Sequence, residues 1–175
     1  MLPKSTIPKH KPLWDPLGND TRYFVVTGGR GSGKSFEVGR FASLLSFNPS
    51  EKVLFTRQTM TSAHLSIIPE FQEKIQLLNI EPYFDVNRNE ITNKQSKSQI
   101  IFKGIKTSSG DQTANLKSLQ GINVWILDEA EELIDESIFD KINLSIRQKG
   151  VQNRIILILN PATKEHWIYK RFFER

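Results

Sequence analysis

The chain has 175 residues, of which 38% are hydrophobic and 25% charged, and its formal net charge is +5. This composition is ordinary for one soluble globular domain and excludes disordered, collagen-like and coiled-coil chains. Because it contains no cysteine, the sequence has no disulfide framework, no thiol nucleophile and no cysteine-ligated zinc. No apolar run approaches the roughly 18 residues of a membrane helix, and no secretory signal is recognisable, so we expect no membrane partner.

The positive charge is concentrated near the C-terminus. Residues 141–175 hold eight Lys or Arg and two Glu, whereas residues 1–140 are close to neutral. A basic segment can attract nucleic-acid phosphates, or it can be a solvated surface whose neighbour is absent. Both interpretations stay open at this point.

The predicted elements alternate along the chain between strands and helices. Residues 1–20 contain four prolines and predict an irregular N-terminal arm that wraps or frays, followed by one domain over residues 21–175. Short apolar runs predict buried strands at residues 23–27, 53–56, 99–102, 124–127 and 155–159. Helical spacing of apolar residues predicts helices at residues 35–46 and 70–78, and a stripe through Ile134, Ile138, Ile142 and Ile146.

This alternation favours an α/β fold with a mainly parallel sheet and helices on both faces. The turn-rich stretch at residues 85–102 predicts a β-hairpin or meander inserted beside that sheet.

The strongest motif is Gly28-Gly29-Arg30-Gly31-Ser32-Gly33-Lys34-Ser35, which follows a predicted strand and opens a predicted helix. Glycines at these positions let backbone N–H groups turn inward around a phosphate, and the helix start adds its positive dipole end. In such a loop Lys34 reaches the β- and γ-phosphates, and the Ser35 hydroxyl binds Mg²⁺. The motif therefore predicts a site for a nucleoside triphosphate.

A second motif consists of a predicted buried strand that runs directly into Asp128 and Glu129. Placed beside the phosphate loop, Asp128 would hold Mg²⁺ and Glu129 would polarise the attacking water. Glu131 and Glu132 are more typical of acidic residues in the first turn of a helix. A Glu directly after the metal-binding Asp favours hydrolysis of the nucleotide. Guanine recognition is not expected, because residues 93–96 lack the aspartate of the Asn-Lys-x-Asp motif.

These motifs, together with residues 53–58, 116–133 and 159–173, resemble the ATPase domain of phage terminase large subunits, the DNA-packaging motors of tailed phages. The last stretch contains Asn160-Pro161 followed by His166-Trp167, which narrows the resemblance to one terminase subgroup. The resemblance implies a P-loop NTPase fold of the ASCE, RecA-like type that uses ATP and Mg²⁺. It also implies translocation of double-stranded DNA into a procapsid inside the host bacterial cytoplasm.

Further roles follow from the resemblance alone. Arg30 resembles the loop arginine that contacts the γ-phosphate, and Asn160 lies where the family's coupling motif senses that phosphate. Lys117 lies in the stretch that matches a basic residue supplied in trans, but a lysine cannot make the bidentate contact of an arginine. Arg57 can hold a phosphate or cap the following helix. Apart from the resemblance, Trp14, Arg22 and Tyr23 lie just before the first predicted strand and are candidates for contact with the adenine.

The resemblance also implies partners: the portal protein, the small terminase subunit and neighbouring copies in a homo-oligomeric ring. The family's C-terminal nuclease domain has no counterpart in these 175 residues, so no nuclease activity is expected from this chain. Aromatic residues near the C-terminus can stack on nucleic acid, but they are more typical of a helix that docks on its own core. Two other functions stay open, a helicase-like DNA-dependent ATPase and an ATP-gated binding module with little turnover.

Overall fold

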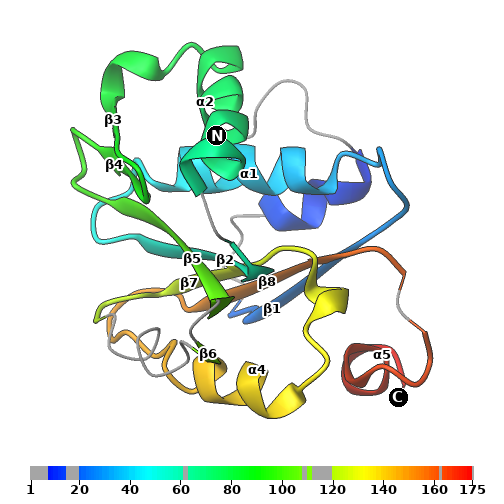
Figure 1. Ribbon diagram of the computed structural model, residues 1–175. Helices are drawn as coiled ribbons and strands as arrows, with labels where there is room; N and C mark the ends of the chain where they lie inside the picture. Colours follow the sequence, from blue (N-terminus) through cyan, green and yellow to red (C-terminus); the bar gives the residue numbers. More distant parts are fainter. Residues whose placement is uncertain are drawn as a thin grey trace.

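The structure, a computed structural model, describes residues 8–14, 20–60, 63–107, 110–111, 120–161 and 163–174. These residues form an eight-stranded, mainly parallel sheet that has helices on both faces (Figure 1). The strands are β1 (Tyr23–Thr27), β2 (Lys52–Thr59), β3 (Phe84–Val86), β4 (Glu90–Asn93), β5 (Gln99–Thr107), β6 (Gly110–Asp111), β7 (Val124–Leu127) and β8 (Arg154–Leu159). Within those ranges, no helix has both the length and the apolar content needed to span a bilayer.

The helices are four α-helices and four short 3₁₀ helices within the described ranges. The α-helices are α1 (Lys34–Leu45), α2 (Ile67–Leu77), α4 (Glu136–Asn143) and α5 (Trp167–Phe172). The 3₁₀ helices are η1 (Pro8–Trp14), η2 (Ala63–Leu65), η3 (Glu81–Tyr83) and η4 (Ala130–Glu132). The predicted α/β fold is therefore confirmed.

The strand order is β1-β8-β7-β2-β5-β4-β3, with β6 paired to β5. Strands β1, β8, β7, β2 and β5 run parallel, whereas β4 and β3 are antiparallel and form the predicted meander. Five parallel strands place five carboxyl ends at one edge of the sheet. That edge is where ligands bind in open α/β sheets.

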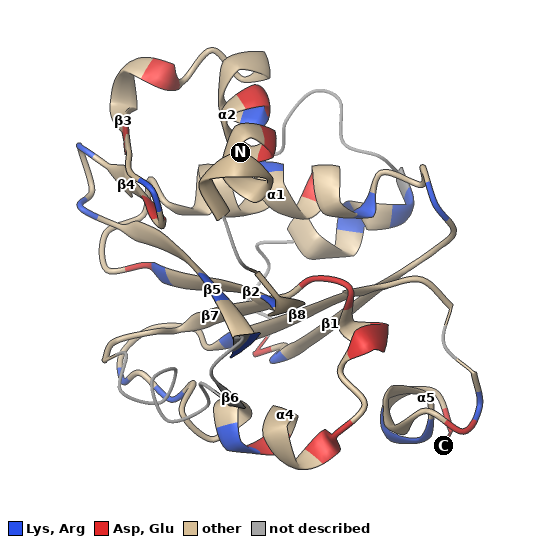
Figure 2. Ribbon diagram, in the orientation of Figure 1, with Lys and Arg blue, Asp and Glu red and all other residues tan. Residues whose placement is uncertain are grey.

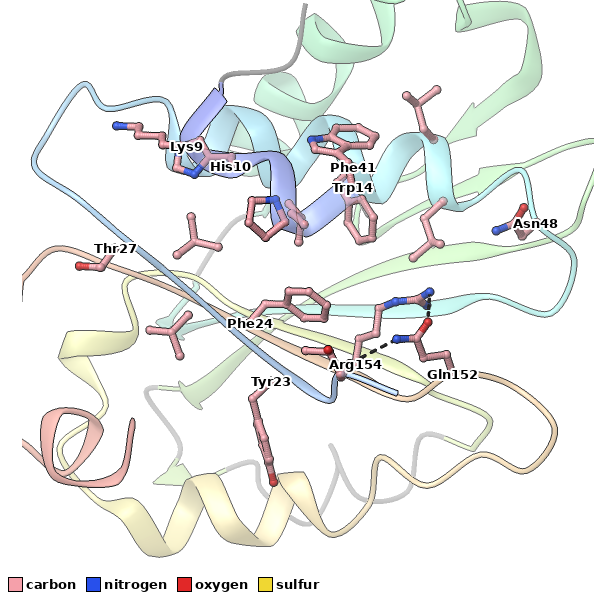
Figure 3. Close-up of a pocket in the computed structure, with 17 residues that line it drawn as sticks. Lys9, His10, Trp14, Tyr23, Phe24, Thr27, Phe41, Asn48, Gln152 and Arg154 are labelled. Atoms are coloured by element: carbon pink, nitrogen blue, oxygen red, sulfur yellow. Dashed lines mark hydrogen bonds between the residues drawn. The ribbon is translucent and has the colours of Figure 1, made fainter. Parts of the chain in front are cut away.

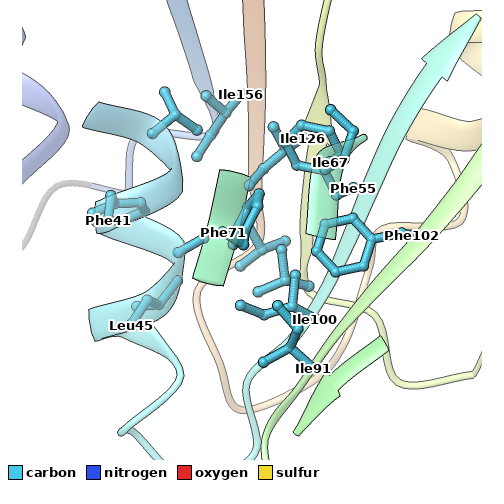
Figure 4. Close-up of a cluster of buried hydrophobic side chains, with 14 of the residues drawn as sticks. Phe41, Leu45, Phe55, Ile67, Phe71, Ile91, Ile100, Phe102, Ile126 and Ile156 are labelled. Atoms are coloured by element: carbon cyan, nitrogen blue, oxygen red, sulfur yellow. The ribbon is translucent and has the colours of Figure 1, made fainter. Parts of the chain in front are cut away.

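One face of the sheet is covered by α1, α2 and η1 (Figure 1). Its buried cluster includes Phe55, Phe71 and Phe102, whose ring centroids lie 5.0–5.6 Å apart (Figure 4). On α1, the predicted apolar face is confirmed, since Val38, Phe41, Ala42 and Leu45 are all buried. This packing fixes α1 over the sheet and so fixes the loop that precedes it.

The other face is covered by α4 and α5. Phe139 of α4 is fully buried between Trp125 of β7, at 5.2 Å between ring centroids, and Trp167 of α5, at 4.8 Å. This aromatic stack joins the strand that leads to Asp128 with the C-terminal helix.

Two expectations need correction or refinement. The helical stripe from Ile134 to Ile146 is wrong at both ends. The side chain of Asp135 accepts a hydrogen bond from the Ser137 N–H and caps α4 there, which leaves Ile134 75% exposed. The helix ends at Asn143, so Ile146, although buried, lies outside it. The N-terminal arm wraps rather than frays over residues 8–14, where the Trp14 Nε1–H donates to Glu37 Oε1 at 2.7 Å. The domain boundary at residue 20 stays a prediction.

We predict that Phe139→Ala lowers the free energy of unfolding by about 3–5 kcal/mol, because it opens a cavity between two indole rings. Urea unfolding tests this prediction: the midpoint should fall, while the slope of the unfolding free energy against urea concentration stays the same. Phe173→Ala is the matched control, since that residue is 46% exposed and the loss of its ring is expected to cost within about 0.5 kcal/mol. Equal effects of the two substitutions would show that the stack does not hold this face together.

Candidate functional site

The phosphate loop connects β1 to α1 at the carboxyl edge of the sheet. Gly31 and Gly33 have φ of +72° and +78°, in the left-handed region that other residues enter only at a cost. The backbone N–H of Glu37 donates to the Gly33 carbonyl at 2.9 Å, which starts the ladder of α1 directly after the loop. The unpaired N–H groups of the first helical turn therefore face the loop, an arrangement suited to an anion.

Lys34 is only 8% exposed, and its ammonium lies within the loop. The Nζ atom donates to the carbonyls of Gly28 and Gly29, the latter at 2.9 Å, and to Asn160 Oδ1 at 3.2 Å. These three acceptors match the three N–H donors of an ammonium group, and the Ser32 hydroxyl, at 3.4 Å, is a fourth and weaker contact. Lys34 is thus saturated by this chain's own oxygens, and a phosphate must displace at least one of them.

Asp128 follows β7, whose four residues are all fully buried. Its side chain is 3% exposed, and its Oδ1 accepts from the Ser35 hydroxyl at 3.2 Å. The two predicted metal ligands, Ser35 and Asp128, are therefore adjacent. Hard oxygen donors of this kind suit Mg²⁺, which takes one or two protein ligands and completes its shell with phosphate oxygens and water.

The part of the chain that the structure describes holds no closed protein cage for a metal. Nowhere among the described residues do three His, Cys, Asp or Glu side chains converge on one point. A Mg²⁺ ion at Ser35 and Asp128 would therefore depend on the oxygens of a nucleotide, as is usual for this ion.

Arg57, which the sequence offers as a phosphate contact or a helix cap, has a different partner in the structure. It neither caps a helix nor lies free for a phosphate in this structure, because its Nε and Nη2 both donate to Asp128 Oδ2, at 2.9 and 2.7 Å. It also lies 3.7 Å from a Glu129 carboxylate oxygen. The sequence does carry one signal, since Arg57 directly follows the predicted strand at residues 53–56.

Glu129 has an uncommon backbone and an altered acidity. Its φ of +53° lies in the left-handed region, a conformation that costs about 1 kcal/mol or more outside glycine. Partial burial raises the pKa of the Glu129 carboxyl above its ordinary value; the Arg57 guanidinium opposes this rise and the Asp128 carboxylate adds to it. With 47% of its side chain exposed, Glu129 remains accessible to a water molecule beside the loop.

Asn160 directly follows β8 and lies between two charged side chains. Its Oδ1 accepts from Lys34, and its Nδ2–H donates to Glu131 Oε1 at 2.7 Å. Glu131 and Glu132 lie in the first turn of a helix, as expected, but this helix is only the single 3₁₀ turn η4. The Glu131 carboxylate also accepts a hydrogen bond from Asn160 at the site, which was not expected.

The remaining candidates are less well connected to the site. Arg30 is exposed on the turn of the phosphate loop. Lys117 falls outside the described residues. The guanidinium of Arg22 donates to the Asn143 carbonyl and Oδ1, at 2.9 and 2.8 Å, which gives it a role in packing α4.

A cavity of about 880 Å³ runs beside β1, between η1, α1 and the sheet (Figure 3). Trp14 and Tyr23 line it, as does Thr27, the last residue before the phosphate loop. The indole N–H of Trp14 already donates a hydrogen bond to Glu37. The assignment of Trp14 to the adenine therefore stays a prediction.

Acidic residues occupy the turn after β7, close to the carboxyl ends of the central strands (Figure 2). The aromatic C-terminal segment docks on the chain itself, as expected, with Trp167 buried and the ring centroid of Phe172 5.5 Å from that of Tyr23.

Comparison with known proteins identifies the family of this chain. The family model described as phage terminase large subunit matches residues 20–175. The large terminase subunit of Bacillus phage SPP1 is 26% identical over 166 residues, which is 85% of this chain and 37% of that protein. The chain thus spans well under half of this curated relative.

Solved structures share the fold at low identity. The large terminase of a thermophilic bacteriophage superposes with a TM-score of 0.72 at 16% identity, covering 95% of this chain and 42% of that one. The complex of that thermophilic terminase with ATP-γ-S gives a TM-score of 0.64 at 14% identity, covering 89% of this chain and 36% of that one. The ATPase domain of the Thermus phage P74-26 large terminase gives 0.59 at 20% identity, covering 85% and 62%. Because the family match extends over nearly the whole described domain, this chain belongs to the phage terminase large subunit family, with the fold of a P-loop NTPase.

Proposed function

We propose that this chain is a Mg²⁺-dependent ATPase whose turnover drives the movement of double-stranded DNA. One observation supports this most directly: Lys34, Ser35, Asp128, Glu129 and Asn160, which come from three separate parts of the sequence, converge at the carboxyl ends of β1, β7 and β8. Each of these residue types suits one part of triphosphate hydrolysis.

Binding would depend on the loop of residues 28–35. The backbone N–H groups of this loop would enclose the β-phosphate, and Lys34 would exchange one of its present acceptors for a phosphate oxygen. The large terminase of the thermophilic bacteriophage binds ATP-γ-S, which supports an adenine nucleotide as the ligand. Ser35 and Asp128 would hold Mg²⁺, which when bound supplies positive charge against the triphosphate oxygens.

Hydrolysis would depend on Glu129. Its exposed carboxylate lies one residue from the metal-binding Asp128, where it can accept a proton from a water aligned with the γ-phosphate. Arg30 would add positive charge from the loop, and Asn160 would respond to the presence of the γ-phosphate through its bond to Lys34.

The work done by this turnover is DNA packaging. Membership of the terminase large subunit family supports translocation of double-stranded DNA into a procapsid by a ring of subunits, in contact with the portal and the small terminase subunit. The reaction would take place in the cytoplasm of the infected bacterium. We assign no nuclease activity to these 175 residues.

We expect Glu129→Gln to lower steady-state ATP hydrolysis by about 10²-fold or more, since the amide cannot accept the proton from water.

In the unsubstituted chain, turnover per subunit should rise with protein concentration, because neighbouring subunits complete the ring. Flat turnover that is unchanged in Glu129→Gln would refute the catalytic assignment. Nucleotide binding without turnover, even with DNA present, would favour an ATP-gated binding module.

The pH dependence of kcat/KM offers a separate test, because this ratio reports the pKa of the free enzyme's base. Glu129 must be ionised to act, so activity is lost as the pH falls through its pKa. Burial raises that pKa, so the loss should begin at a higher pH than for an ordinary Glu at 4.5. In Arg57→Gln the opposing positive charge is gone, so the pKa of Glu129 should rise further. The fall of kcat/KM on the acid side should then occur at still higher pH.

Comparing Arg57→Gln with the parent chain cancels the titration of ATP itself, which is common to both profiles. If the fall of kcat/KM on the acid side stays at the same pH in Arg57→Gln, or moves to lower pH, Glu129 is not the titrating base.

A further inference from the structure

The turn η4 lies between the phosphate site and the C-terminal helix and is bonded to both. On one side, Glu131 Oε1 accepts from Asn160 Nδ2 at 2.7 Å, and Asn160 in turn accepts from Lys34. On the other side, the backbone carbonyls of Glu131 and Leu133 contact the ring nitrogens of His166 and Trp167, at 3.1 and 2.5 Å. These four hydrogen bonds and one short turn connect the Lys34 ammonium to α5.

The state of the His166 ring follows from its own contacts. The Ile168 N–H donates to His166 Nδ1 at 3.2 Å, which requires an unprotonated Nδ1. The proton of the neutral ring is then on Nε2, and Nε2 donates to the Glu131 carbonyl. Both contacts from α5 to the turn are therefore N–H donors to carbonyl oxygens, as a docked helix requires.

Burial of the Glu131 carboxylate is unfavourable in free energy. Its Oε2 atom is buried and has no hydrogen-bond partner among the described residues. A buried acceptor left unpaired costs about 1–3 kcal/mol, more for a charged group. Packing alone would favour an apolar side chain here, and the arrangement is instead explained by the contact to Asn160.

We propose that Glu131 is a positioning residue that transmits the occupancy of the phosphate site to α5. This inference rests on the proposed function, since it concerns the same nucleotide. Glu131 itself touches neither phosphate nor metal in this arrangement; it acts through Asn160 on one side and through the turn η4 on the other.

The physical basis is a competition for Lys34. Its three N–H donors are already used by the close acceptors on Gly28, Gly29 and Asn160, so an incoming phosphate oxygen must displace one of these. The Asn160 contact, at 3.2 Å, is the longest of the three and joins two side chains, so it is the one most readily released. Release frees Asn160 to move with Glu131, whose backbone carbonyl and neighbouring Leu133 hold α5.

The helix α5 is suited to respond. Besides the two bonds to the turn, Arg171 joins it to α4 through Glu136 and Asp140, at 2.9 and 2.7 Å. These carboxylates are 44% and 48% exposed, so the ion pairs are screened and contribute little to stability. The first turn of α5 is anchored by the buried Trp167 and Ile168, so a change of η4 can loosen the last turn of the helix, around Arg171, without unfolding the domain.

The test is hydrogen exchange of the amides of residues 168–174, with and without Mg²⁺ and ATP-γ-S. In the parent chain we expect nucleotide to change exchange there at least about fivefold, or ~1 kcal/mol. Glu131→Ala should remove this change while the Kd for ATP-γ-S shifts less than about threefold. Glu131→Gln should retain the change, because its amide oxygen can still accept from Asn160.

Glu132→Ala is the matched control, since Glu132 is an exposed carboxylate on the same turn, and it should behave as the parent chain. If Glu131→Ala does not fold, Trp167→Phe removes one of the two bonds between η4 and α5, at the Leu133 carbonyl, and should reduce the change. Steady-state kinetics of Glu131→Ala should show a lower kcat and a KM that changes little.

The outcomes separate the two proposals. Nucleotide binding without any response of α5 in the parent chain, or an undiminished response in Glu131→Ala, overturns this inference alone. Failure of the parent chain to bind nucleotide overturns the proposed function, and the inference with it.

Discussion

The register of four parallel strands determines the rest of the site. Thr27 of β1 pairs with Leu159 of β8, so the phosphate loop begins beside Asn160. On the other side, Thr56 of β2 pairs with Leu127 of β7, which places Arg57 beside Asp128. A shift of one residue in either ladder would turn every side chain to the opposite face and separate these pairs. Buried apolar residues on both faces of the sheet hold this register, so the geometry of the site is a consequence of core packing.

Within this framework the charges form one connected set. Lys34 is held by backbone carbonyls and Asn160, Asp128 by Ser35 and Arg57, and Glu131 by Asn160. Lys34 and Asp128 thus have partners that a triphosphate or Mg²⁺ would replace, and Glu131 is linked to Lys34 through Asn160. Binding is then an exchange of partners, and each exchange alters an element at the edge of the sheet. This is how a site of this construction can couple a ligand to movement.

The sequence predicted those parts of the fold that depend on local periodicity and on motifs. The strands β1 and β7 were predicted residue for residue, because each is a short apolar run between polar residues. The phosphate loop and Asp128 were assigned from spacing and strand context, and the structure places them together. Ile134 was misassigned because the cap at Asp135, a local hydrogen bond, outweighed the four-residue repeat.

The partners of the charged residues could not be predicted in the same way. Arg57 and Asp128 are 71 positions apart, and Asn160 and Glu131 are 29 apart. Which side chains meet depends on strand order, and nothing local in the sequence specifies that β8 lies between β1 and β7. A glutamate such as Glu131 looks the same in the sequence whether it favours a helix dipole or binds an amide across the site.

The central claim, that Lys34 and the strand ends around it form a nucleotide site, is tested most directly by calorimetric binding of Mg²⁺ and ATP-γ-S to the parent chain and to Lys34→Ala. A charge-assisted contact to phosphate contributes about 1.5–3 kcal/mol, so the Kd should rise by roughly 10- to 150-fold in the variant. Lys170→Ala, an exposed lysine on α5, is the control and should leave the Kd unchanged. Equal affinity of the parent chain and Lys34→Ala would contradict the account.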